Sequence, residues 1–275
     1  MRGAASRPLR ECQIMSRVGL VVALALAAAV GLVFGIWPQI DLELAGLFFD
    51  AARGGFWRSF DPLYLLARDA GSWLIALVAA PAGVALFIKL IRPQRPLMVP
   101  GRAIVLVLAT LAVVPGLLAN VLLKEHWGRP RPIDVAEFGG DEHFRPWWDP
   151  RGDCARNCSF IAGEPSGAFW TIAPAALAPP PWRAAAYGAA LVFGAGLGLQ
   201  RMAAGAHFFS DVAFAGIIAF LVIWIAHGCL YRWRLTQLTD KAVDEAVAWL
   251  ARLPLGILRR IGLSFGASDG VNTRR

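Results

Sequence analysis

The sequence contains little that would hold a metal ion. Only four cysteines occur in 275 residues, at positions 12, 154, 158 and 229. Cys154 and Cys158 have three residues between them and no nearby pair of histidines, which does not fit a metal-ligand pattern. We therefore expect no metal and no cofactor. If their loop faces an oxidising compartment, a disulfide between Cys154 and Cys158 is favoured over two free thiols.

Charged residues are missing from several long stretches of the chain. Of the residues, 57% are hydrophobic, and they come in uncharged blocks instead of amphipathic stripes. This pattern predicts an integral membrane protein. The net charge of +8 raises the question of a nucleic-acid partner. We expect none, because the basic residues lie beside the apolar blocks, as membrane anchors do.

A cleavable signal peptide is not indicated either. The apolar run from Val18 to Trp37 is too long for a signal-peptide core and has no clean cleavage site before Pro38. We interpret it as a retained first membrane span.

Six apolar segments predict six membrane-spanning helices, at about 18–36, 71–90, 103–123, 166–178, 184–199 and 208–230. Basic residues beside alternate turns place those turns and both termini in the cytoplasm. The region 41–69, the loop 124–164 and the turn 201–207 then lie outside. We expect one membrane domain over 1–235 and a basic tail over 236–275, whose amphipathic helix lies on the inner membrane surface.

A short polar segment, residues 200–211, separates the last two apolar blocks and is called the polar island below. In it, Arg201 precedes His207 and Asp211, which are four residues apart and would lie on one face if the chain is helical from Phe208 onward. A carboxylate that accepts from one ring nitrogen would leave the other free to act as a nucleophile. The alternative is a packed histidine beside a local helix cap.

A second set of cations follows the third apolar block. Lys124 stands at the end of that block and Arg131 lies between two prolines that stop the helix. The predicted topology places them on the same external face as Arg201 and His207. This agreement favours a site for a phosphate group over an accidental spacing.

The island and these cations together resemble the motifs of the type 2 phosphatidic acid phosphatase superfamily. Lys124 to Pro132 matches its first motif, K-x6-R-P. The third motif, S-R-x5-H-x3-D, matches at Arg201, His207 and Asp211, with Gln200 in place of the serine.

The second motif, P-S-G-H, departs from the family. Aligned on Ser159-Phe160, it falls on residues 161–164 and puts Glu164 where the family has a histidine proton donor. A less favoured alignment uses Pro165-Ser166-Gly167 and places Ala168 at that position. Glu164 has an alternative reading as a loop carboxylate paired with an arginine.

The resemblance implies an all-α, six-span helical bundle that removes phosphate through a phosphohistidine. His207 is then the nucleophile, Asp211 its orienting carboxylate and Glu164 the general acid. The groups that the resemblance assigns to phosphate binding are Lys124, Arg131, Arg201 and the backbone amide of Gly163. Several cations around a phosphoryl group are what such a transfer requires.

The expected substrate is a phosphomonoester or diphosphate of a membrane lipid in a bacterial inner membrane, with the active site facing the periplasm. Lipid A, undecaprenyl diphosphate, phosphatidylglycerophosphate and phosphatidic acid are candidates. The Trp-containing loop 133–160 favours a large headgroup such as that of lipid A. Two other hypotheses stay open: a lipid phosphotransferase and a non-catalytic protein that binds headgroups.

Overall fold

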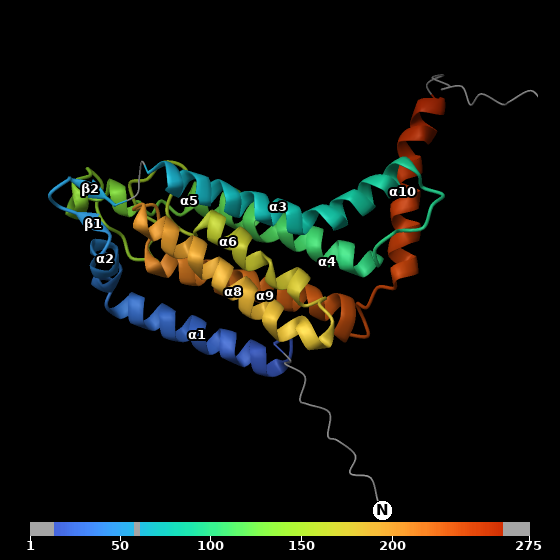
Figure 1. Cartoon of the computed structure of the whole chain (residues 1–275), viewed down its shortest axis with the longest axis horizontal. Coiled ribbons are helices and arrows are strands. Elements are labelled where there is room, and N and C mark those ends of the chain that lie inside the picture. The colour runs from blue at the N-terminus through green and yellow to red at the C-terminus, as the bar shows by residue number, and fades with distance from the viewer. Residues whose placement is uncertain (1–13, 58–60, 261–275) are drawn as a thin grey trace, which may run out of the picture.

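Long helices that run side by side form almost the whole molecule (Figure 1). The computed structural model describes residues 14–57 and 61–260, with side chains placed through residue 253. The predicted all-α membrane bundle is confirmed. Cys12 and residues 261–275 lie outside the described residues.

Four helices of the described chain are long and apolar enough to cross a membrane. They are α1 (Arg17–Ile36), α3 (Pro62–Ile91), the continuous helix Gly101–His126 and the helix Phe209–Arg232. Large apolar side chains such as Val18 and Leu77 point outward from the bundle, as expected for a surface in contact with lipid. These helices correspond to the first, second, third and sixth predicted spans.

Helix α3 starts nine residues before the predicted span, so the end of the predicted external loop is helical. Asp61 accepts a hydrogen bond from the amide of Leu63 (2.8 Å) and Pro62 occupies the first helical position. A capping carboxylate followed by proline is a strong helix start. The extra turns bring the Tyr64 hydroxyl within hydrogen-bond distance of Arg201 (3.2 Å).

The third span changes its winding before it reaches Lys124. It begins as α4 (Gly101–Leu111), continues as a π-helix over Ala112–Leu123 and ends as α5 (Lys124–His126). Pro115 lies inside the π stretch and cannot donate a backbone hydrogen bond, which accounts for the local departure from α geometry.

The prediction that the fourth span, residues 166–178, forms one continuous helix is wrong. The segment forms α6 (Gly163–Trp170) and α7 (Ile172–Ala175), which separate at Thr171. Pro174 explains the break, because proline removes a backbone donor and its ring clashes with the carbonyl one turn earlier. Glu164 is therefore in the first turn of a helix and not in a loop.

Helix α6 lies in the middle of the bundle. Its residues from Pro165 to Trp170 are buried, and the Trp170 indole donates to Thr110 Oγ1 (3.0 Å) on α4.

Helix α8 (Pro180–Ala203) begins inside the proline triplet, four residues before the predicted span, since proline is favoured at the first helical position. The count of six spans stays a prediction.

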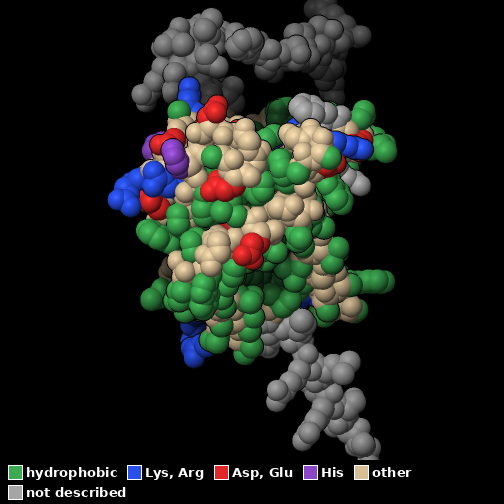
Figure 2. Space-filling view, turned by 90° about the vertical axis from the view of Figure 1, so that its left-hand side faces the viewer, with side chains coloured by type: hydrophobic (Ala, Val, Ile, Leu, Met, Phe, Trp, Pro, Cys, Tyr) green, Lys and Arg blue, Asp and Glu red, His purple; other side chains and the backbone are tan. Residues whose placement is uncertain are grey.

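Helix α9 (Phe209–His227) continues into a π turn over Gly228–Arg232. Short elements gather at one end of the bundle, at the left of Figure 1. They are α2 (Gln39–Gly46), the antiparallel pair β1 (Phe49–Asp50) and β2 (Gly55–Phe56), and the 3-10 turns Pro132–Asp134 and Ala136–Phe138. Figure 2 looks onto this end and shows charged side chains scattered among hydrophobic ones.

Helix α10 (Asp240–Arg260) crosses the other end of the bundle at a steep angle (Figure 1). Its Asp244 accepts from the buried ammonium of Lys89 on α3 (2.7 Å), and its Asp240 pairs with Arg102 on α4 (3.2 Å). This placement suits a helix on the membrane surface. The division of the chain at residue 235 stays a prediction.

Candidate active site

His207 lies in the short connection between α8 and α9, at the end of the bundle that carries α2 and α5. The side chain is buried, and its Nδ1 is 2.8 Å from the backbone oxygen of Ser159. A carbonyl oxygen only accepts hydrogen bonds, so Nδ1 carries the proton and Nε2 carries the lone pair. Nε2 is buried and has no hydrogen-bond partner in the described structure. This is the state that a nucleophilic imidazole needs.

Burial lowers the pKa of His207 well below its usual value, and the charges of Lys124, Arg201 and Arg131 lower it further. Both effects disfavour the charged imidazolium. The neutral, nucleophilic form therefore persists to lower pH than for an exposed histidine.

Asp211 does not contact His207 directly, and the expectation of a hydrogen bond between them is wrong. One Asp211 oxygen accepts from the hydroxyl of Ser159 and from the amide of Phe208, and the other pairs with Arg129. Phe208 is the residue before the first turn of α9, so Asp211 acts there as a helix cap. Asp211 reaches the imidazole only through Ser159, whose backbone oxygen holds Nδ1.

Arg129 is an important residue that the motif analysis missed. It is fully buried and its guanidinium bonds to Asp211, to Asp41 Oδ2 (2.8 Å), to Ser210 Oγ (2.8 Å) and to the backbone oxygen of Arg145 (2.9 Å). Ionic bonds to the two carboxylates raise the pKa of Arg129. The sequence feature that could have identified Arg129 is its place in the Arg-Pro-Arg-Pro repeat, residues 129–132.

Asp41 is the other half of this buried cluster. It comes from α2, which the sequence analysis placed in an external loop, and it is 1% exposed. Its carboxylate also accepts from the amide and the hydroxyl of Ser210. The cluster therefore ties the N-terminal part of the chain to the helix that follows His207.

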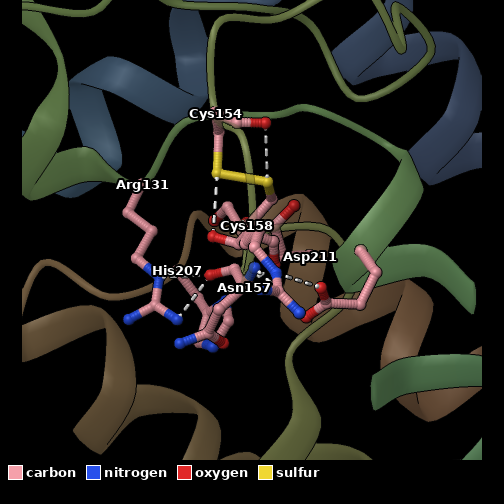
Figure 3. Close-up of a disulfide and its surroundings, with 9 residues drawn as sticks. Arg131, Cys154, Asn157, Cys158, His207 and Asp211 are labelled. Atoms are coloured by element: carbon pink, nitrogen blue, oxygen red, sulfur yellow. Dashed lines mark hydrogen bonds and ion pairs between the residues drawn. A yellow bond between two sulfur atoms is a disulfide. The ribbon is translucent and has the colours of Figure 1, made fainter. Parts of the chain in front are cut away.

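The three predicted phosphate-binding cations converge near His207. Arg131 donates to the backbone oxygen of Asn157 (2.7 and 3.1 Å), as Figure 3 shows. Arg201 donates to the hydroxyl of Tyr64 (3.2 Å). Lys124 is buried at the end of the π-helix. Each of them lowers the pKa of His207, so their positive charges act on the imidazole.

Gly163 begins α6 and lies against Lys124. A β-carbon added at Gly163 would be 2.8 Å from Lys124 Nζ and 2.8 Å from Asn120 Oδ1. Only glycine lets the ammonium approach the backbone so closely. The amide of Gly163 is at the positive end of a helix, where anions are stabilised.

Glu164 also reaches this cluster. Its carboxylate is 3.8 Å from Arg201 Nε, so the pairing with an arginine that we considered from sequence is present. The other alignment of the second motif does not reach the site, because Ser166 is fully buried and donates to the backbone oxygen of Ala162 (2.7 Å), while Ala168 is buried in the bundle core.

The structure joins Cys154 to Cys158 by a disulfide above the site (Figure 3). The amide of Cys158 donates to the backbone oxygen of Lys124 (2.9 Å), and the preceding Asn157 holds Arg131. The bridge therefore closes the turn that positions one of the cations. His143, in the same loop, is 82% exposed and pairs with Asp153 (3.5 Å).

Among the residues that the structure describes, no group of three His, Cys, Asp or Glu side chains is placed to hold a metal ion. A buried neutral imidazole, three cations and one carboxylate are suited to phosphoryl transfer. The fold and the site thus define a membrane protein of the phosphohydrolase class.

The chain belongs to the PAP2 superfamily, whose family model matches residues 102–235. It is 34% identical over 223 residues to a lipid A 4'-phosphatase of Francisella tularensis subsp. novicida (strain U112), a match that covers 79% of this chain and 98% of that protein. It is 40% identical over 119 residues to a lipid A 4'-phosphatase of Rhizobium leguminosarum, covering 43% of this chain and 51% of that protein. No solved structure matches the chain. The chain is therefore a membrane lipid phosphatase of this superfamily, a multi-pass protein of a bacterial inner membrane.

Proposed function

We propose that the protein removes a phosphomonoester from lipid A by way of a phosphohistidine at His207, on the periplasmic face of the membrane. The observation that carries the proposal is the buried, unpartnered Nε2 of His207, with its Nδ1 proton held by Ser159 and three cations around it. A phosphoryl group bound to Lys124, Arg131 and Arg201 lies in front of that lone pair.

In the first step, the Nε2 lone pair of His207 attacks phosphorus and the bond from phosphorus to the lipid oxygen breaks. The cations stabilise the charge on the other phosphoryl oxygens. The leaving oxygen takes a proton from Glu164. In the free protein burial raises the pKa of Glu164, but the charges of Arg201 and Lys124 outweigh it and lower that pKa. A bound phosphate offsets these cations and favours protonation of the carboxyl.

In the second step, water attacks the phosphoryl group and gives its proton to the Glu164 carboxylate. The bond between phosphorus and Nε2 breaks, inorganic phosphate leaves and neutral His207 is restored. The intermediate places positive charge on the imidazole, which the backbone oxygen of Ser159 stabilises at Nδ1.

Three features support the choice of substrate and side. The relatives named above are lipid A 4'-phosphatases, and one of them is matched over nearly its whole length. The disulfide lies at the same end as His207 and is favoured in an oxidising compartment such as the periplasm. Lys89 and Arg102 lie at the other end with α10, as cytoplasmic anchors do.

The test is phosphate release by the purified protein from lipid A, undecaprenyl diphosphate, phosphatidylglycerophosphate and phosphatidic acid. We expect lipid A to be preferred. His207→Ala should abolish release, Glu164→Gln should lower it strongly, and the exposed control His143→Ala should leave it unchanged. Rapid acid-free quenching with mass spectrometry should find phosphate on His207. Release that survives His207→Ala contradicts the proposal, and transfer of phosphate to a second lipid would indicate a phosphotransferase.

A further inference from the structure

An apolar groove runs between α3 and α8 on the outside of the bundle. It has a volume of about 760 Å³ and is lined mainly by hydrophobic side chains of the two helices. The helices touch at its floor, where a β-carbon on Gly71 would come within 2.8 Å of Leu197 Cδ2. The groove is open to the outside of the bundle, since lining residues such as Leu63 and Val192 are 72% and 74% exposed.

One end of this groove shares its wall with the phosphate site. Tyr64 lines the groove, and its hydroxyl accepts from Arg201. Gln200, the residue before Arg201, also lines the groove and donates to the backbone oxygen of Tyr64 (2.9 Å). The residue that departs from the family's third motif therefore joins α8 to α3 at the mouth of the groove.

The walls of the groove are about as long as one membrane leaflet is thick. Its lining extends from Leu63 to Leu74 on α3 and from Val192 to Ala203 on α8. At the helical rise of about 1.5 Å per residue, each wall is roughly 16 Å long. Half of a hydrocarbon core of about 30 Å is roughly 15 Å.

A larger groove, of about 970 Å³, lies between α1, α8 and α9. Its lining residues lie between Ile14 and Phe220 in the sequence, hold no charged side chain and include neither Tyr64 nor a neighbour of Arg201. It therefore lacks the contact with Arg201 that the groove between α3 and α8 makes through Tyr64.

We propose that the groove between α3 and α8 binds an acyl chain of the lipid whose phosphate lies at His207. The inference rests on the proposed phosphatase function. A phosphate held by Arg201 leaves the attached lipid at the mouth, beside Tyr64, and the apolar wall then leads one chain down into the leaflet. Since bilayer lipid is as apolar as the groove, the benefit is orientation of the phosphate toward Nε2 more than affinity.

Glycine positions on α8 provide a matched pair of variants. Gly196 lines the groove, and a β-carbon added there meets nothing within 4 Å. Leucine at this position fills the groove without disturbing the fold and favours the helix over glycine. Gly188 on the same helix is equally open but does not line the groove, so Gly188→Leu is the control.

The experiment compares kcat/KM for lipid A with that for a chainless, water-soluble ester, p-nitrophenyl phosphate. In Gly196→Leu the ratio of the two values should fall about ten- to a hundredfold, the scale of a displaced reacting group. In Gly188→Leu the ratio should stay within about twofold. An unchanged ratio in Gly196→Leu, or an equal loss on both substrates, overturns the groove proposal. If the unmodified protein hydrolyses neither ester, the proposed function itself fails and this inference with it.

A second measurement needs no turnover. A phosphate-bearing lipid with a photoreactive group at the end of one acyl chain should label the groove walls, at residues 63–74 and 192–203, in the unmodified protein. Gly196→Leu should lose this labelling and Gly188→Leu should keep it. Labelling of α1 and α9 instead would place the chain in the larger groove and refute the assignment.

Discussion

Replacement of Arg129 by methionine is the most informative change to the buried charge cluster. Methionine has a similar length but no charge, so the substitution leaves the carboxylates of Asp41 and Asp211 buried without their cation. Breaking a buried ion pair costs about 3–5 kcal/mol, because the remaining charge is uncompensated. That is a large part of the roughly 5–15 kcal/mol that separates most folded and unfolded states.

The assay is thermal unfolding in detergent, followed by tryptophan fluorescence. At about 2–4 °C per kcal/mol for a chain of this size, Arg129→Met should lower Tm by roughly 6–20 °C. The exposed Arg156, which pairs with Glu125 at 3.3 Å and is 86% exposed, provides the control. Arg156→Met should change stability by no more than about 0.5 kcal/mol.

Asp41→Asn tests the charge balance of the same cluster. The amide keeps the shape and leaves one cation facing one carboxylate, so its cost should be smaller than that of Arg129→Met. Because the two residues touch, the double variant should show a coupling of about 0.5–3 kcal/mol. If Arg129→Met unfolds within a degree or two of the unmodified protein, the reasoning that this cluster holds the fold together is refuted.

Three further predictions concern the site. Because the pKa of His207 is lowered in the folded protein, its imidazole should stay neutral below pH 6.5 in ¹⁵N NMR spectra. The unfolded chain binds that proton more readily, so the free energy of unfolding should fall as pH drops through about 6.5. This part of the loss should vanish in His207→Ala. An ordinary titration near 6.5 would contradict this. Cys154→Ser should cost roughly 2 kcal/mol by loop entropy, and mass spectrometry of unreduced protein should find the bridge; two alkylated thiols would exclude it. Gly163→Ala should raise KM about tenfold or more by displacing Lys124 from the phosphate position. Gly188→Ala, whose added β-carbon meets open space, should leave KM unchanged. Equal KM values in the two variants would show that Gly163 is not part of the site.

Much of the bundle follows from local properties of the sequence. Long uncharged runs have to avoid water, and a helix is the form in which such a run satisfies its own backbone hydrogen bonds within a membrane. The ends of the helices were harder to predict from the sequence. Asp61 and Pro62 extend α3 outward, and Pro174 breaks the fourth segment, because capping and proline geometry act over single turns while hydrophobicity is averaged over many residues.

The candidate site shows the same division. The spacing of Lys124, Arg131, Arg201 and His207 in their motifs was sufficient to expect them near one another, and the structure places them so. The partner of the imidazole was not predictable from spacing. A separation of four residues puts Asp211 one helical turn from His207 only if both are helical, and His207 precedes α9.

The sequence by itself therefore determined the membrane class, the family motifs and the residue types available for phosphoryl transfer, because these depend on composition and on short-range order. Only the tertiary structure decided which groups meet: Ser159 with His207, Arg129 with Asp41, and Tyr64 with Arg201. Each of these contacts joins residues at least 48 positions apart. Such pairings follow from how helices pack and from the need of every buried charge for a partner, and neither is encoded in the spacing within one motif.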